Sequence, residues 1–177
     1  MTFLELSQTR RSIRKYTTEP VSDEAVQQIL QAALMSPASK RCNPWEFVVV
    51  RRREVLNQLA DCRTYGSTML QEAAVAIVVC VDPSLTDTWQ CDGAIAAHQM
   101  LLEAADIGLG ACWVQVFGRA AKSEGTGSAE DLVKTLCQIP DNMNVLCIIS
   151  IGHKNEERKP RDLEKLQYEK IHIEHYK

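Results

Sequence analysis

The stretch EAADIGLGACWVQVF, residues 103–117, joins a helical pattern directly to a short apolar run. Gly108 follows the last helical position at Ile107, and glycine is the residue that most often ends a helix there. The run from Ala111 to Phe117 is short and apolar, which is typical of a buried strand. A helix that leads straight into a buried strand predicts a domain in which helices and a sheet are layered.

The same alternation extends along the rest of the chain. Short apolar runs that predict strands span Phe47 to Val50, Val75 to Val81, Ala111 to Phe117 and Val145 to Ile151. Helices are expected after the capping box Thr2–Glu5, from Ser22 to near Pro37, and over Glu54 to Ala60, Asp92 to Ile107 and Ser128 to Leu136. These elements predict an α+β fold with α/β layering, as one domain over residues 1–177 with a charged arm from about 153 to 177.

Composition narrows the functional classes. The 177 residues are about the length of one domain, and a hydrophobic fraction of 45% is that of a folded globular protein. The formal net charge of −3 argues against a nucleic-acid binder, which usually has a basic domain. No apolar run approaches the roughly 20 residues of a transmembrane helix, and the first residues lack the apolar core of a signal peptide. We therefore expect a cytoplasmic protein with neither nucleic-acid nor membrane partners.

Seven cysteines are spread along the chain, with no C-x-x-C pair and no histidine at metal-ligand spacing. Several lie within apolar runs, where a free cysteine behaves as a small hydrophobic residue. We therefore expect buried, reduced thiols, and neither a disulfide framework nor a metal site.

The stretch TRRSIRKY, residues 9–16, places four positive side chains within six residues. Arg10, Arg11 and the Ser12 hydroxyl offer guanidinium forks and a further donor within one turn, which suits a phosphate better than a single carboxylate. The second cationic pair, in KPR at residues 159–161, could converge on the same anion. The alternative is a solvated basic patch, as most charge runs are.

The loop SPASKRCNPW, residues 36–45, contains two prolines and several small residues between a predicted helix and a predicted strand. Small residues let a backbone approach a flat ligand closely, and prolines hold a loop in shape before binding. The alternative is a plain connector. Gly108 and Gly110 indicate only a tight turn, because their spacing is not that of the dinucleotide motif G-x-G-x-x-G.

Five pieces in this order resemble the nitroreductase family of FMN-dependent flavoproteins, over nearly the whole chain. They are RRSIRKY (10–16), SPASKRCNPWEFVVV (36–50), EAADIGLGACWV (103–114), CQIPDNMNVLCIISIGHK (137–154) and KPR (159–161). The resemblance implies a nitroreductase-like fold, with a central mixed β-sheet flanked by helices and a C-terminal arm exchanged in a homodimer. It also implies an FMN-dependent oxidoreductase that passes hydride from NADH or NADPH to an electron-poor acceptor such as a nitroaromatic or a quinone.

By the same resemblance, particular residues would bind the cofactor at the dimer interface. The phosphate would lie against Arg10, Arg11, Ser12, Lys159 and Arg161, and the pyrimidine end of the flavin against Arg14. The flavin ring would lie along Trp113, Val114 and Gln115, whose backbone amides would face N5, and would meet Pro37, Ala38, Ser39 and Arg41 of a loop that crosses the interface. No catalytic side chain and no metal ligand is implied, because the cofactor carries the hydride chemistry.

Two features leave alternatives open. Where the family often has Asn and then Gln before Pro-Trp, this chain has Arg41 and Asn43, and the extra cation would favour anionic substrates or a more oxidising flavin. The helix from Asp92 to Ile107 is apolar nearly all round, which requires burial either in a dimer interface or within one domain. An FMN-binding sensor or carrier without efficient turnover is the alternative function.

Overall fold

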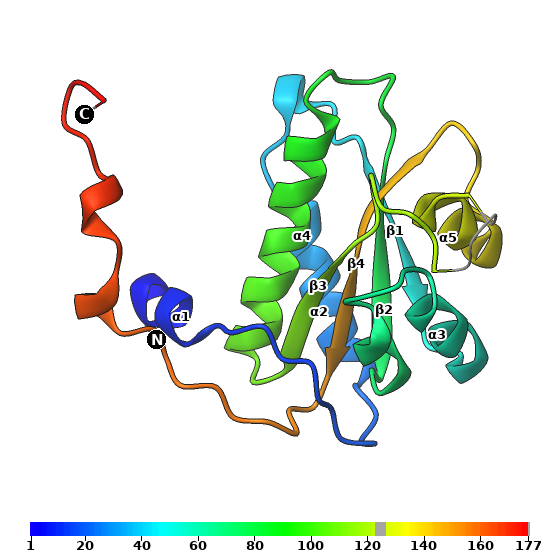
Figure 1. The fold of residues 1–177 in the computed structure, drawn as a ribbon, viewed down its shortest axis with the longest axis horizontal. Helices are drawn as coiled ribbons and strands as arrows, with labels where there is room; N and C mark the ends of the chain where they lie inside the picture. The colour runs from blue at the N-terminus through cyan, green and yellow to red at the C-terminus, as the bar shows by residue number, and fades with distance from the viewer. Residues whose placement is uncertain (123–126, 177) are drawn as a thin grey trace.

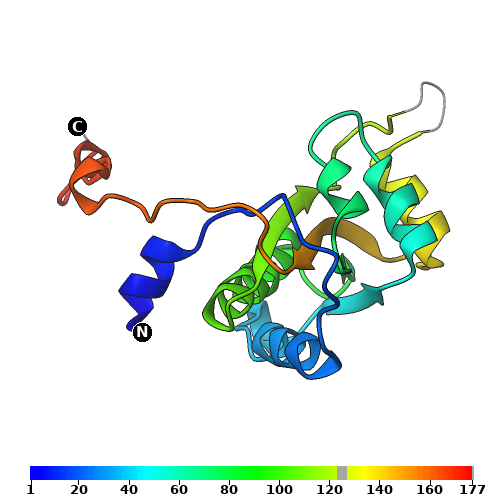
Figure 2. The same cartoon turned by 90° about the horizontal axis from the view of Figure 1, so that it is seen from below.

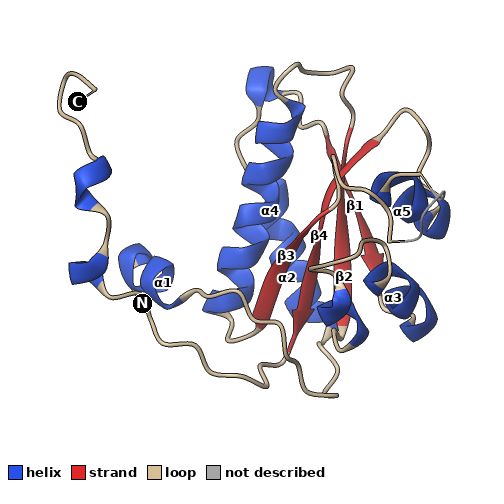
Figure 3. Ribbon diagram, viewed as in Figure 1, coloured by secondary structure: helices blue, strands red, loops and turns tan. Residues whose placement is uncertain are grey.

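The computed structural model describes residues 1–122 and 127–176, and Figure 1 shows one sheet with helices on both sides. The helices are α1 (Phe3–Thr9), α2 (Asp23–Leu34), α3 (Arg53–Ala60), α4 (Trp89–Asp106) and α5 (Ala129–Cys137). The strands are β1 (Trp45–Val50), β2 (Val75–Val81), β3 (Gly110–Gln115) and β4 (Asn144–Gly152), drawn in red in Figure 3. The α+β class expected from the sequence is confirmed.

The four strands lie in the order β1-β2-β4-β3, and each pair of neighbours is antiparallel. We expected a mixed sheet from the sequence. For these four strands that prediction is wrong, because every pair is antiparallel. Val50, the last residue of β1, pairs with Ala76 near the start of β2, so the connection between them leaves and re-enters the sheet at the same end. Such a connection reverses the strand direction, whereas parallel neighbours need a crossover to the opposite end. Parallel pairing within the described ranges is limited to an isolated bridge between Ser12 and Ala111.

Both faces of the sheet are covered by helices. Figure 2 shows α2 and α4 on one face and α3 and α5 on the other. Ile77 of β2 and Ile149 of β4 belong to the core beneath α2 and α4. Their chain neighbours Val78 and Ile148 belong to the core beneath α3 and α5. Every residue of β2 is buried, as expected for a strand whose alternate side chains enter two cores.

Helix α4 lies close against the sheet but leaves one stripe uncovered. A Cβ atom on Gly93 would lie 2.7 Å from Val81 Cγ2, so glycine permits this close approach. Cys91, Ile95 and His98 on another side of the helix are exposed, Ile95 by 40%. Burial on every side is thus not achieved by one chain, and the dimer interface remains a prediction.

Both ends of the chain extend away from the sheet. Figure 2 shows α1 and the C-terminal arm projecting from the same side of the molecule. The arm contains two short 3₁₀ turns, Leu163–Lys165 and Tyr168–Lys170, and its side chains are almost all exposed. Ile171 and Ile173 are 63% and 74% exposed, so the arm does not pack on its own core.

Within the described residues, no helix has the length and apolar character needed to span a bilayer.

Candidate functional site

The basic N-terminal segment lies across one end of the sheet, where polar contacts fix it. The Ile13 N–H donates to the Ala111 carbonyl at 3.1 Å. The Tyr16 hydroxyl donates to the Ile13 carbonyl at 2.7 Å and lies 2.8 Å from Ser150 Oγ. Burial raises the pKa of Tyr16, so the hydroxyl stays protonated and available as a donor. These contacts therefore fix the position of the backbone around Ile13 relative to the sheet.

Two paired glycines make room for this segment. Gly110 of β3 and Gly152 of β4 lie opposite each other in the sheet. A Cβ on Gly110 would lie 2.7 Å from Ile13 Cγ2, and a Cβ on Gly152 would lie 2.8 Å from Tyr16 Cδ1. Any larger residue would lift the segment, because real Cβ atoms do not come this close to another carbon. The glycines therefore set where the neighbouring arginines project.

Cations from both ends of the chain converge beside this segment. Gln8 Nε2 donates to the Arg161 carbonyl at 2.8 Å, and the Arg161 N–H donates to the Gln8 carbonyl at 2.9 Å. Arg11 Nη1 donates to the Lys159 carbonyl. Burial lowers the pKa of the Arg10 guanidinium, and the positive charges of Arg161 and Arg11 lower it further. The Arg10 guanidinium is therefore partly buried and lies among other cations.

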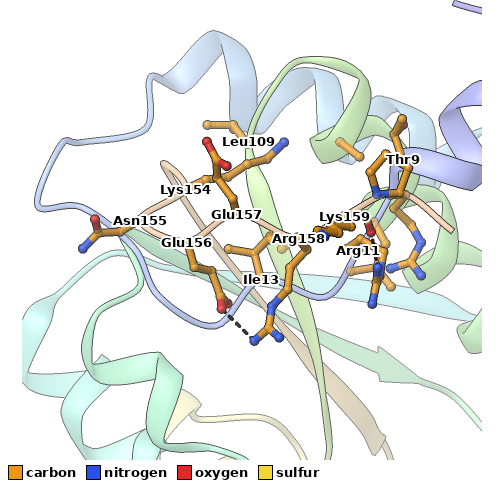
Figure 4. A pocket seen from close by; sticks show the side chains of 15 residues that line it. Thr9, Arg11, Ile13, Leu109, Lys154, Asn155, Glu156, Glu157, Arg158 and Lys159 are labelled. Carbon is orange, nitrogen blue, oxygen red and sulfur yellow. Dashed lines mark hydrogen bonds and ion pairs between the residues drawn. The ribbon is translucent and has the colours of Figure 1, made fainter.

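No carboxylate within the part of the chain that the structure describes lies within 4.0 Å of the Arg10, Arg11 or Arg161 guanidinium. Arg10, Arg11 and Lys159 line a cleft of about 1050 Å³, which Figure 4 shows from close by. Small-molecule sites usually have about 300–1000 Å³, so the cleft is large enough for a cofactor. Ser12, in its bridge to Ala111, lies next to Arg11 along the segment and is half-buried.

Glu156, which the sequence analysis did not single out, fixes the backbone at Arg14. The Arg14 N–H donates to Glu156 Oε1 at 2.6 Å, and Arg158 forms an ion pair with Glu156 Oε2 at 2.7 Å. The pKa of Glu156 is lowered from its ordinary value, mainly because its carboxylate accepts the hydrogen bond from the Arg14 N–H. The Arg14 side chain is exposed. Glu156 lies in a charged run that looks like a solvated tail, so its role was not visible from the sequence.

The open edge of β3 offers backbone donors. The carbonyl of Ala111 accepts from Ile13, and the carbonyl of Gln115 accepts from Arg63 Nη1 at 2.8 Å, so both face away from β4. Because alternate residues turn their backbone groups to the same side, Trp113 presents its N–H to the same edge. The Trp113 indole N–H donates to Gln115 Oε1 at 2.9 Å, which fixes both side chains. The side chain of Val114 is fully buried and belongs to the core beneath α3 and α5, so only its backbone could contact a ligand.

The loop from Pro37 to Asn43 lies at the opposite end of α4. Asp92, in the first turn of that helix, is 2% exposed and accepts from the Ser39 N–H at 2.9 Å. A rise of about 1.5 Å per residue places Ala105, which lines the cationic cleft, about 20 Å from Asp92 along the helix. The structure therefore does not bring Pro37, Ala38, Ser39 and Arg41 to the cationic cleft of the same chain.

The surroundings of the buried cysteines disfavour the thiolate form. All seven are free, and Cys62, Cys80, Cys112 and Cys147 are buried, as expected for reduced thiols in a core. Burial raises the pKa of Cys62 to about 11 and that of Cys80 to about 12, so neither is a thiolate at neutral pH. No group of three or more His, Cys, Asp or Glu side chains among the described residues is placed to hold a metal ion.

Comparisons with known proteins agree with this architecture. The model of the Nitroreductase family matches residues 8–75 and 63–153. A protein of Methanothermobacter thermautotrophicus, provisionally named NADH dehydrogenase/NAD(P)H nitroreductase, is 37% identical over 177 residues, which cover 98% of this chain and 87% of the relative. A protein of Archaeoglobus fulgidus with the same provisional name is 36% identical over 159 residues, covering 88% and 87%.

The solved structure of an FMN-dependent nitroreductase from Clostridium difficile R20291 superposes with a TM-score of 0.94 at 38% identity. The match covers 98% of this chain and 100% of that protein. With sequence and fold in agreement over nearly its whole length, the chain belongs to the nitroreductase family.

Proposed function

We propose that this protein is an FMN-dependent oxidoreductase that transfers hydride from NADH or NADPH to an electron-poor acceptor such as a nitroaromatic or a quinone. The observation that carries the proposal is the convergence of Arg10, Arg11 and Arg161 beside a cleft, with no described carboxylate within 4.0 Å of their guanidinium groups. Glu156 and Glu157 also line the cleft, and Glu156 forms its ion pair with Arg158. FMN, when bound, supplies the hydride chemistry, and the protein supplies binding, orientation and electrostatics. The donor set fits the group, because a dianionic phosphate is bound best by charge-assisted guanidinium forks.

In this proposal each part of the site has a separate task. Arg10, Arg11 and Ser12 bind the phosphate together with Lys159 and Arg161, which the hydrogen bonds to Gln8 and Arg11 place beside them. The backbone of Trp113, Val114 and Gln115 lies along the flavin ring, and the open edge of β3 offers the Trp113 N–H as a donor toward N5. No side chain of the protein needs to act as a nucleophile or as a general acid.

The Arg14 guanidinium would stabilise the negative charge that the reduced flavin gains around N1 and O2. We expect Arg14→Ala to lower the two-electron reduction potential by roughly 30–60 mV, as a charge interaction of about 1.4–2.8 kcal/mol gives for such a couple. Equilibration with reference dyes under anaerobic conditions measures the potential. A variant that keeps the potential but loses affinity for FMN would place Arg14 at the phosphate instead.

A homodimer with FMN at its interface is part of the proposal. The loop from Pro37 to Ser39 lies too far along α4 to reach the cationic cleft of its own chain, whereas in a dimer it could reach the flavin of the other protomer. The buried Ser36 Oγ has no hydrogen-bond partner among the residues that the structure describes. The exposed stripe of α4 around Ile95 and the exposed arm after residue 156 also offer surface for a second copy. Sedimentation equilibrium of the purified protein gives its mass in solution and so tests whether it is a dimer.

We further propose a single FMN-binding domain over residues 1–177 and a cytoplasmic location. Seven free cysteines suit a reducing compartment. Cell fractionation with an antibody to the protein tests the location.

The visible spectrum of the purified protein tests the main proposal. We expect a yellow protein whose flavin is bleached by anaerobic NADH or NADPH and regains its colour on addition of a nitroaromatic or a quinone. A yellow protein that neither nucleotide bleaches would be a sensor or carrier. A colourless protein that takes up no added FMN would contradict both functions.

A further inference from the structure

The loop of residues 38–43 carries two adjacent cations on a backbone of unusual shape. Lys40, Arg41 and Asn43 have φ angles of 52°, 57° and 43°, in the left-handed region that residues other than glycine rarely adopt. Such a backbone conformation is strained and persists only where the surrounding structure requires it. The structure therefore holds this loop in a specific shape against its local preference.

The buried carboxylate of Asp92 supplies the restraint. Asp92 Oδ1 accepts from the Ser39 N–H at 2.9 Å and from the Ser39 hydroxyl at 3.2 Å. Asp92 Oδ2 accepts from the Thr88 hydroxyl at 3.4 Å, and the Ser39 and Thr88 hydroxyl oxygens lie 2.5 Å apart. The contact ties the start of the left-handed turn to the first turn of α4, whose N-terminal dipole favours a negative charge.

The two cations at the tip of this turn are not neutralised by their own chain. Lys40 and Arg41 are exposed, and no described carboxylate lies within 4.0 Å of either charge. Ordinary surface cations sit on flexible side chains above a relaxed backbone. Here the backbone is strained and anchored by a buried acid, so the direction in which both side chains leave the backbone is set before any ligand arrives.

We propose that Lys40 and Arg41, positioned by Asp92, form a cationic rim of the substrate pocket. This rim binds a negatively charged group on one of the two substrates. The proposal rests on the proposed function, in which this loop lies beside the flavin of the other protomer. The chemical class is a carboxylate, sulfonate or phosphate attached to a planar reacting group. The two sources are an anionic acceptor, such as a nitrobenzoate, and the phosphates of the nicotinamide donor.

Matched substrates separate the two sources. With NADH as donor, para-nitrobenzoate and para-nitrobenzamide differ in charge but little in shape, so the ratio of their kcat/KM values reports recognition of an anionic acceptor. With a neutral quinone as acceptor, NADPH, NADH and N-benzyl-dihydronicotinamide report recognition of donor phosphates. We expect Arg41→Gln to lower kcat/KM for the charged member of one series by about five- to tenfold, and Lys40→Gln by about threefold. The neutral members should lose less than the charged members do, because their binding involves no charge at the rim, so the ratio within each series is the quantity that tests the rim.

Arg52→Gln is the matched control. Arg52 is an exposed arginine at the start of α3, on the other face of the sheet, and the same change of charge there should leave both ratios unaltered. High ionic strength should reduce the wild-type ratio toward that of Arg41→Gln, since exposed charges are screened by salt. Equal ratios in the wild type, Arg41→Gln and Lys40→Gln for both series would overturn the proposal.

Asp92 is tested through the same ratio. Asp92→Ala should lower the charge discrimination about as much as Arg41→Gln does, although both cations remain, because the turn is no longer anchored. Asp92→Asn keeps an oxygen acceptor for the Ser39 N–H and should restore most of the discrimination. If Asp92→Ala lowers thermal stability but leaves the ratio unchanged, the residue has only a structural role.

The proposed function fails in a different way. A protein that lacks FMN, or that oxidises no reduced nicotinamide with the neutral quinone, contradicts the oxidoreductase before the rim is tested. A protein that turns over neutral substrates well but shows no charge discrimination contradicts only the rim.

Discussion

Arg10→Ala is expected to raise the dissociation constant of FMN by roughly 30- to 100-fold, which corresponds to about 2–3 kcal/mol. Arg10 is partly buried and lies within the repulsive field of Arg161 and Arg11, so in the free protein its charge is destabilised. A bound phosphate reverses this, because it supplies a negative charge next to Arg10, whose guanidinium has no described carboxylate within 4.0 Å. The loss of affinity should therefore exceed that of an ordinary surface ion pair.

Riboflavin provides the internal control for this prediction, because it has the same ring system as FMN and no phosphate. Titration of apoprotein with each compound, followed by flavin fluorescence, gives both dissociation constants. Arg10→Ala should weaken binding of FMN but change binding of riboflavin by less than about twofold, since the charge-assisted hydrogen bonds are made to the phosphate. Equal losses for both compounds would mean that Arg10 supports the fold or the ring, not the phosphate. Arg52→Ala, which removes an exposed arginine far from the cleft, should leave both constants unchanged.

Local features of the fold could be predicted from the sequence. The capping box expected at Thr2–Glu5 is present, and a second one at Ser128–Asp131 begins the helix expected from Ser128. The hydrogen bonds of such a box join residues three apart and need no other part of the chain. The expected strands and helices also occur, with ends shifted by a few residues. The direction of the strands was not predictable in this way, because it depends on where the connection from Arg51 to Ala74 re-enters the sheet.

The candidate site depends more heavily on contacts between distant residues. The hydrogen bond from Arg14 to Glu156 joins positions 142 apart, and that from Ser39 to Asp92 joins positions 53 apart. Neither carboxylate belongs to a local pattern, so composition and spacing alone could not have identified them. The cationic motifs were visible because arginines cluster in the sequence itself, and the order of the motifs then indicated the family. Their contacts with FMN remain predictions.

The glycine pair Gly110 and Gly152 shows how the sheet controls the site without touching a ligand. The N-terminal segment needs Ile13 and Tyr16 packed closely on β3 and β4 so that Arg10 and Arg11, which precede them, line the cleft. Glycine in a strand interior weakens it and often marks a place where another backbone approaches closely. Here that cost is compensated by the burial of Ile13 and Tyr16, each 4% exposed.

Gly110→Ala is therefore expected to lower the free energy of unfolding by about 1–3 kcal/mol, as overpacking of a close contact does. The new methyl group would lie 2.7 Å from Ile13 Cγ2 and 2.9 Å from Ile13 Cβ, so a side-chain rotation alone cannot relieve it and the segment must move. Because Arg11 and Ser12 precede Ile13 directly, FMN affinity should fall as well, by about tenfold if one phosphate hydrogen bond is lost. Urea denaturation of the apoprotein and titration with FMN measure the two effects.

A double-mutant cycle with Ile13→Ala determines whether the contact itself is responsible. Ile13→Ala removes the Cγ2 atom that the new methyl group would meet, so Gly110→Ala should cost less in that background, with a coupling of about 1 kcal/mol. If the two changes are additive, Gly110→Ala acts through the strand and not through the segment above it. If Gly110→Ala alters neither stability nor FMN affinity, the segment is free to rise, and the sheet does not set the height at which the arginines meet the phosphate.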